Sequence, residues 1–257
     1  MSKIAEIIDE ETVYVYDKSQ FDAYAIRNCG QVFRDFDCVI EETNDKIVIK
    51  GDSEKLWEFF DLDTDYNEIK RELSKFDLIK AAVLAGGGIR ILRQPFVPCV
   101  VSFIISANNN IKRFSKTIEK IGELSVKNLL RFSEEDFRRV GCGYRSAYLV
   151  KAVRQLAEVS SEEISKLDNE CLYKELRKIC GVGDKICRCV LLFCFHRLDV
   201  VPVDTWLEKV YRKVFNDEIE KSRVRMAEKL QQRWGKYAGV AQQYVFYYMQ
   251  NLRGELK

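Results

Sequence analysis

The chain has 257 residues, with 42 Lys and Arg against 40 Asp and Glu, and 47% of its residues are hydrophobic. That length suffices for one large domain or two modest ones. A net charge of +2 excludes a protein coated in positive charge, although helix N-termini and backbone amides can still hold phosphates. The apolar run Val190–Phe195 is too short to cross a membrane. The N-terminus lacks an apolar signal segment, so we expect a cytoplasmic protein.

The cysteines do not suggest a metal centre. Nine are present without a regular framework, which favours core thiols in a reducing compartment over disulfides. Cys187 and Cys189 would point about 200° apart around an expected helix. The chain has no Cys-x-x-Cys pair and only one histidine, His196. We therefore expect no structural zinc ion, no iron–sulfur cluster and no other cofactor.

Short β-like runs dominate the first 95 residues. The predicted strands are Thr12–Tyr16, Gln31–Phe36, Cys38–Glu42 and Lys46–Ile49, and helical patterns follow at Ser53–Phe60 and Tyr66–Lys75. We expect residues 1–95 to form a small α+β domain built on an antiparallel sheet.

After Pro95 and Pro98 the pattern becomes helical and stays so. The predicted helices are Cys99–Ala107, Ile111–Ile121, Ser125–Leu130, Glu134–Val140, Arg145–Val159, Asn169–Ile179, Lys185–His196, Thr205–Phe215, Arg223–Trp234 and Ala238–Leu252. Ser133 and Asp168 are expected to cap helices, and Gly141 to occupy a left-handed C-cap. Residues 96–257 are therefore expected to form a larger all-α domain, which makes the whole chain an α+β protein.

The segment from Leu176 to Lys185 reads LRKICGVGDK and carries the most information about function. An amphipathic helix ends there, a turn with Gly181 and Gly183 follows, and a second helix begins at Asp184. The glycines permit positive φ and close approach of another backbone. The unpaired amides that open the second helix can hold a phosphate. A lone Gly-x-Gly is equally typical of an ordinary helix hairpin, so this pattern leaves both interpretations open.

Two further residues favour the first interpretation. Lys185 directly follows the hairpin, and nineteen residues later VPVD places Asp204 at the mouth of a helix. Taken singly, Lys185 could be a solvated first-turn lysine and Asp204 an N-cap, for which Thr205 with Glu208 offers a competing capping box. Together, the two segments resemble the helix-hairpin-helix and Gly/Pro-rich-loop-plus-Asp signature of the DNA glycosylase superfamily.

The resemblance implies a chemistry for the pair. Departure of a purine base generates oxocarbenium character at the sugar, which the Asp204 carboxylate would stabilise. An uncharged Lys185 amine would attack the anomeric carbon and form a Schiff base, after which β-elimination cuts the strand. The surroundings of Lys185 therefore have to favour the uncharged amine.

Other segments are similar to 8-oxoguanine DNA glycosylases and run through both expected domains. Asn28–Arg34 resembles the loop whose glycine carbonyl accepts a hydrogen bond from the base, a role that falls to Gly30. Because 8-oxoguanine carries a hydrogen on N7 that guanine lacks, such a carbonyl favours the oxidised base. Ala238–Phe246 matches the helix that closes the base pocket: Gln242 would bond the Watson–Crick edge and Phe246 would stack on the base.

The remaining site residues also follow from the resemblance. Cys189 falls where the family places a thiol against the other face of the base. Asn108 and Arg113 would face the cytosine left behind, Tyr144 would wedge into the stack, and Arg145 would donate to cytosine acceptors. Without the resemblance, Asn108 would be read as part of a helix-ending turn, Tyr144 and Arg145 as a surface helix start, and Phe246 as core packing.

DNA contacts complete the expected site. Gly181 and Gly183 would meet the strand through their backbones. Trp206 stands where better-known eukaryotic members have a histidine near a phosphate, and Met249 replaces an acidic residue of the last helix. We expect none of the residues to bind a metal ion.

The expected function is that of a bifunctional base-excision-repair enzyme of a bacterium or archaeon. It would flip 8-oxoguanine out of double-stranded DNA, preferably opposite cytosine, cleave the glycosidic bond and nick the strand, as a monomer associated with the nucleoid. One alternative is a glycosylase for another damaged base, but relatives of that kind usually carry four C-terminal cysteines for an iron–sulfur cluster, and none follows Cys194. A non-catalytic helix-hairpin-helix module would form no covalent adduct. An all-helical scaffold would leave Lys185 and Asp204 in unrelated places.

Overall fold

The computed structural model describes residues 3–34, 36–107 and 111–255. The chain forms two compact units, which we call the terminal unit (Met1–Arg93 with Leu198–Lys257) and the central unit (Gln94–Arg197). A small antiparallel sheet and many helices confirm the α+β class. The units group the C-terminal segment with the N-terminal part of the chain, while the division into domains 1–95 and 96–257 stays a prediction.

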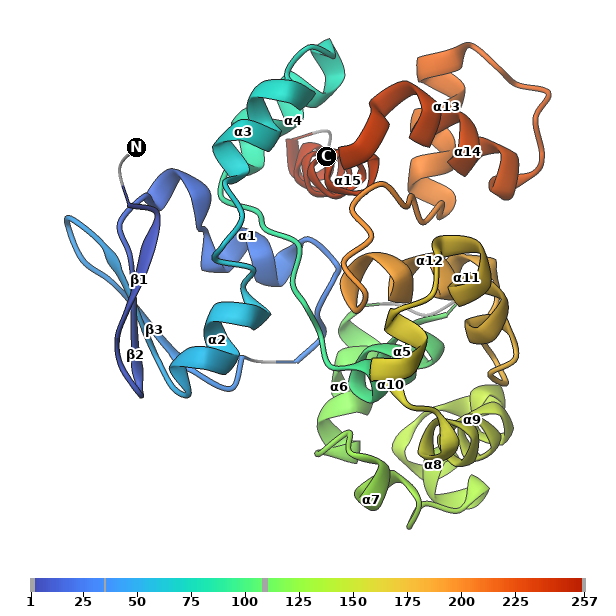
Figure 1. The fold of residues 1–257 in the computed structure, drawn as a ribbon. Coiled ribbons are helices and arrows are strands. Elements are labelled where there is room, and N and C mark those ends of the chain that lie inside the picture. The colour runs from blue at the N-terminus through green and yellow to red at the C-terminus, as the bar shows by residue number, and fades with distance from the viewer. Residues whose placement is uncertain (1–2, 35, 108–110, 256–257) are drawn as a thin grey trace. The chain divides into compact units, whose positions relative to one another are not determined.

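The sheet of the terminal unit has four strands in the order β1-β2-β4-β3 (Figure 1). The strands are β1 (Ala5–Asp9), β2 (Thr12–Val15), β3 (Val39–Glu42) and β4 (Ile47–Lys50), and all neighbours pair antiparallel. The sequence predicted the last three of these strands to within a residue or two, and missed β1.

The predicted strand Gln31–Phe36 is wrong, because its described residues form no strand. Val32 and Phe36 are buried in the core of the terminal unit, which is why the run resembles a strand. Gln31 is fully buried and its side chain binds the backbone of Arg90 and Leu92. The segment is thus a loop in which the buried side chain of Gln31, and not the pairing of a strand, makes the hydrogen bonds.

One 3-10 helix (Lys18–Gln20) and four short α-helices complete the described N-terminal part of this unit: α1 (Ala23–Asn28), α2 (Ser53–Phe59), α3 (Tyr66–Leu73) and α4 (Asp77–Gly86). The sequence predicted α2 and α3 but missed α1 and α4. The segment that follows α4 passes so close to α1 that a Cβ on Gly88 would lie 2.5 Å from the backbone nitrogen of Asp22. Only glycine fits this crossing.

A buried arginine joins these segments. Arg90 is fully buried, and its guanidinium lies over the ring of Tyr66, 4.3 Å from the centroid. Burial lowers the pKa of Arg90. The guanidinium donates to backbone carbonyls of Gln20, Phe60, Asp61 and Thr64. These acceptors compensate for the loss of water around the charge.

We expect Arg90→Met to lower the free energy of unfolding by about 3–5 kcal/mol, because several buried carbonyls then lose their donor. Thermal unfolding followed by circular dichroism measures the loss. Lys50→Met, which removes an exposed ion pair with Glu41, is the control and should leave the transition nearly unchanged. Equal losses in the two variants would contradict a structural role for Arg90.

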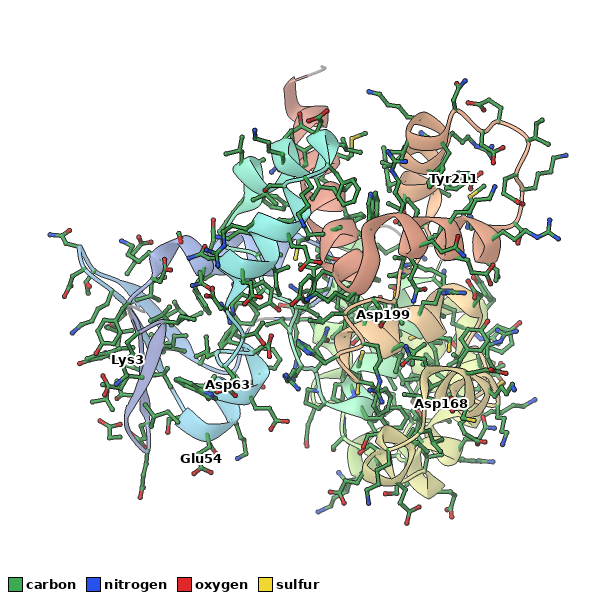
Figure 2. All side chains as sticks on the ribbon, turned by 45° about the horizontal axis from the view of Figure 1, so that its top comes forward. Lys3, Glu54, Asp63, Asp168, Asp199 and Tyr211 are labelled. Carbon is green, nitrogen blue, oxygen red and sulfur yellow. The ribbon has the colours of Figure 1, made fainter. Side chains whose placement is uncertain are left out.

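The central unit consists of helices (Figure 1): α5 (Phe96–Ser106), α6 (Ile111–Ile121), α7 (Val126–Leu129), α8 (Glu134–Val140), α9 (Ser146–Glu158), α10 (Ser161–Ser165), α11 (Asn169–Arg177) and α12 (Asp184–Phe193). Only α10 was not predicted. Ser133 forms a capping box with Asp136, Asp168 (labelled in Figure 2) caps α11, and Gly141 takes φ of 109° at the end of α8. All three capping predictions are confirmed.

The chain returns to the terminal unit with α13 (Thr205–Phe215), α14 (Arg223–Trp234) and α15 (Ala238–Glu255). In Figure 1, α15 lies next to α4, and the two helices pack against each other. Tyr244 of α15 donates to the carbonyl of Ile89, which fixes α15 to the segment after α4. None of the helices in the described ranges combines the length and apolar character needed to cross a membrane.

Candidate active site and DNA interface

The hairpin of the central unit joins α11 to α12 as expected. Gly181 has φ of +86°, and a Cβ there would lie 3.1 Å from Cβ of Tyr148 on α9. Gly183 has φ of −85° and is extended, and the nearest atom to a Cβ there is a guanidinium nitrogen of Arg177 at 3.8 Å. The backbone conformation therefore requires glycine at 181. At 183, the backbone conformation does not require glycine, because φ is negative and a Cβ would meet only ordinary contact distances.

Lys185 lies half-buried in the first turn of α12. Its amine is 6.0 Å from the ring centroid of Phe103 on α5, and Phe103 stacks on Phe193. The adjacent acid is engaged elsewhere, because Asp184 accepts hydrogen bonds from Tyr173 and Arg188. Lys185 thus lies next to the hairpin and near two stacked phenylalanine rings.

Asp204 in the terminal unit caps α13. One carboxylate oxygen accepts from the backbone amides of Trp206, at 2.9 Å, and Leu207, at 2.8 Å. The competing capping box is not formed, since Glu208 instead binds Arg212 and Arg223. Val201 and Val203 are buried and fix the approach to the cap. Two amide donors at the start of α13 therefore fix the position of the carboxylate.

Three of the expected base-binding residues come together in the terminal unit. Gly30 has φ of +81°, and a Cβ there would lie 2.6 Å from Cε1 of Phe246, so this ring covers the Gly30 backbone. Gln242, one turn before Phe246 on α15, is buried, and its Oε1 has no hydrogen-bond partner within the described ranges. A buried acceptor without a donor is costly. An N–H group of a bound base would satisfy it.

Cys189 belongs to the central unit, one turn after Lys185 on α12, and is buried. All nine cysteines are free. Burial raises the pKa of Cys29 to about 11 and that of Cys187 to about 12. Among the described residues, no group of three His, Cys, Asp or Glu side chains is placed to hold a metal ion.

Two of the residues expected at the estranged cytosine meet at a short 3-10 helix, Gly143–Arg145. Tyr144 is 59% exposed, as a wedge must be. The guanidinium of Arg145 lies 4.4 Å from the Tyr144 ring centroid and donates to the carbonyl of Ala107. Its Nε is buried without a partner in the part of the chain that the structure describes. Arg145 is therefore held beside the turn that leads to Asn108.

Asn108 itself lies outside the described residues. Arg113 is exposed on α6. One turn later, Thr117 Oγ1 lies 3.1 Å from the position of a Cβ on Gly141. Helix α6 thus packs against the turn that leads to Tyr144. Trp206, in the first turn of α13, lies under the amine of Lys209, 4.8 Å from a ring centroid.

Sequence reasoning missed two residues beside the site. Tyr148 packs against Gly181 and meets the Tyr144 ring edge-on at 6.3 Å between centroids. Its position four residues after Tyr144 was the available signal, because the two share a helix face. Gln243 donates to the carbonyl of Cys29, directly before Gly30. Here the signal was a second amide, adjacent to Gln242, in the otherwise largely apolar stretch Ala238–Met249.

Comparisons with known proteins identify the family of this chain. Residues 101–236 match the HhH-GPD superfamily of base excision DNA repair proteins, and residues 37–100 match the N-terminal domain of 8-oxoguanine DNA glycosylase. The 8-oxoguanine glycosylase/lyase of Clostridium acetobutylicum, solved with double-stranded DNA containing cytosine opposite 8-oxoguanine, is 31% identical. The match covers 97% of this chain and 99% of that one, with a TM-score of 0.88. The chain belongs to the 8-oxoguanine DNA glycosylase family.

Curated members of the 8-oxoguanine DNA glycosylase family are similar over part of their length. The N-glycosylase/DNA lyase OGG1 of Arabidopsis thaliana is 29% identical over 187 residues, which are 62% of this chain and 51% of the plant enzyme. A probable N-glycosylase/DNA lyase of Methanothermobacter thermautotrophicus is 28% identical over 75% of this chain and 73% of its own length. This chain thus spans about half of the plant family member.

Proposed function

We propose that this protein excises 8-oxoguanine from double-stranded DNA and then nicks the strand as a lyase. The observation that carries the proposal is the cluster of Gly30, Gln242 and Phe246, which offers a ring for stacking, a backbone carbonyl and the buried Oε1 of Gln242 for a purine edge. No described residue donates to the Gly30 carbonyl, which leaves it available to the N7 hydrogen of the oxidised base. Guanine would present a lone pair to this carbonyl and be repelled.

The chemistry falls to the two residues that follow the hairpin. The Asp204 carboxylate stabilises positive charge on the deoxyribose as the glycosidic bond breaks and the base leaves with the electron pair. The uncharged amine of Lys185 forms a bond to C1′ and loses a proton, and the sugar ring opens to a Schiff base. Loss of a proton from C2′ then expels the 3′ phosphate and cuts the strand. Water hydrolyses the Schiff base and frees the lysine.

Recognition of the opposite strand falls to Tyr144 and Arg145. Tyr144 would fill the stack, and Arg145 would exchange the Ala107 carbonyl for the acceptors of the unpaired cytosine. An enzyme with these glycosylase and lyase activities acts on chromosomal DNA. We therefore also infer a location in the cytoplasm, at the nucleoid of a prokaryote.

The experiment that tests the function uses duplexes with 8-oxoguanine opposite each of the four bases. We expect strand cleavage with cytosine to exceed that with adenine by at least about tenfold, since one good pair of hydrogen bonds to a base contributes about 1–3 kcal/mol. Single-turnover rates measure it. Arg145→Met should remove most of the preference for cytosine. The control is Arg154→Met, which changes an exposed arginine of α9, the helix that follows Arg145, and should keep the preference. Equal cleavage opposite all four bases by the unmodified protein would refute the proposed preference.

A further inference from the structure

The loop that carries Gly30 is attached on both sides by buried glutamines. Before Gly30, the carbonyl of Cys29 accepts a hydrogen bond from Nε2 of Gln243, which is 2% exposed. After Gly30, the side chain of Gln31, which is fully buried, donates to the carbonyl of Arg90 at 2.7 Å and accepts from the amide of Leu92 at 2.9 Å. All of these contacts lie within the terminal unit.

These hydrogen bonds join α15, the loop that carries Gly30 and the segment after α4 to one another. Gln243 on α15 holds the loop, Gln31 of the loop holds the segment Arg90–Leu92, and Tyr244 of α15 donates to Ile89 at 3.0 Å in the same segment. Adjacent side chains of α15 therefore reach two parts of the same loop assembly. The segment is itself immobilised, because the Arg90 guanidinium binds four surrounding carbonyls.

Gly30 cannot hold its own conformation. Its φ of +81° is open to glycine, but so are many other values, and a flip of either flanking peptide would turn its carbonyl away. The Phe246 ring covers the backbone from one side but forms no hydrogen bond with it. The direction of the Gly30 carbonyl therefore depends on what fixes the peptide before it and the residue after it.

The neighbouring amides of α15 have different tasks. Gln242 keeps a buried oxygen without a partner in the described ranges, as a group waiting for a ligand does. The side-chain amide of Gln243 instead donates to the Cys29 carbonyl, within the protein. Its amide also lies near the Cys29 thiol, whose pKa burial raises to about 11, so the thiol stays neutral there.

We propose that Gln31 and Gln243 are positioning residues that hold the Gly30 carbonyl toward the N7 hydrogen of 8-oxoguanine. The proposal rests on the proposed function and adds a source for its selectivity: the acceptor that distinguishes the oxidised base is fixed by a pair of buried amides. Neither glutamine touches the base.

The test separates excision of the base from cleavage of a ready-made abasic site, which has no base to recognise. Gln243→Met keeps the size of the side chain but removes its donor. We expect the single-turnover rate of 8-oxoguanine excision to fall about tenfold, the effect of one hydrogen bond. Lyase cleavage of an abasic duplex should stay within twofold of the unmodified protein. Gln31→Met should show the same split, and Gln243→Asn, whose amide falls short, serves if Gln243→Met does not fold.

Gln20→Met is the matched control, because Gln20 is equally buried and binds the backbone amide of Tyr66 and the side chain of Asp17. It should lower the melting temperature similarly and leave the ratio of excision to lyase rates unchanged. In a Gly30→Ala background, Gln243→Met should add little further loss.

Two outcomes would overturn the inference. One is a parallel fall of both activities in Gln243→Met, and the other is full additivity with Gly30→Ala. If the unmodified protein cleaved neither substrate, the proposed function would fail, and the role of the glutamines with it. With the unmodified protein active, either of the first two outcomes would refute only the positioning role.

Discussion

Lys185→Gln should abolish the covalent complex that borohydride traps on DNA containing 8-oxoguanine, and lower strand cleavage by at least about a thousandfold, as loss of a nucleophile does. Reduction captures only the Schiff base between enzyme and sugar, so the trapped band reports directly on the attacking amine. Denaturing gel electrophoresis of labelled duplex measures both quantities. Peptide mapping of the trapped complex should place the sugar on the α12 segment.

The folded state should tolerate this change. Lys185 is half-buried at the start of α12, its amine lies 6.0 Å from the centroid of the Phe103 ring, and glutamine can keep most of the stem packing. Lys174→Gln is the matched control: this lysine is exposed on the neighbouring helix α11, where it pairs with Glu170. Trapping should persist there. A trapped band of normal strength in Lys185→Gln would assign the attack to another amine.

The second large effect is expected at Asp204, where two roles can be separated. Asp204→Asn keeps an oxygen that accepts from the amides of Trp206 and Leu207, so α13 should begin as before. It removes the negative charge, and excision should fall about 100- to 1,000-fold, the size of effect seen when one preorganised electrostatic group is lost. Single-turnover kinetics and thermal unfolding measure the two roles independently.

Asp204→Ala completes the comparison, because it removes the cap as well as the charge. It should lose about 1 kcal/mol of stability relative to Asp204→Asn and be equally impaired in excision. Excision by Asp204→Asn at the rate of the unmodified protein would show that Asp204 is only a helix cap.

Helices with a strong apolar period were predictable from the sequence, and some of their ends were as well. Ile111–Ile121, Thr205–Phe215 and Arg223–Trp234 were predicted at their observed bounds. Some short elements were not: α1 has only six residues after its cap Asp22, which is too short for a period to develop. The run from Gln31 was misread, because burial of Val32 and Phe36 mimics a strand while hydrogen bonds to Gln31 replace strand pairing.

The residues of the candidate site likewise fall into two groups: those that stand in local sequence motifs, and those whose partners lie far away in the sequence. Gly181, Lys185 and Asp204 stand in motifs that are continuous in the sequence, so the resemblance could find them. Gln243 acts on Cys29, 214 residues earlier in the chain, and the second amide beside Gln242 gives no indication of which residue it binds. The arrangement of Arg145 on the Ala107 carbonyl is equally invisible, because a side chain of 3-10 helix meets the end of a helix far upstream.

The cap at the start of α13 also has a consequence for how this protein would respond to laboratory evolution. Ser, Thr and Asn all begin helices well, so a screen for heat resistance would accept any of them at position 204. Only selection for repair would retain the acid that caps the helix today through Trp206 and Leu207. Libraries ranked by melting temperature alone would therefore collect well-folded proteins that bind damaged DNA and leave the lesion in place.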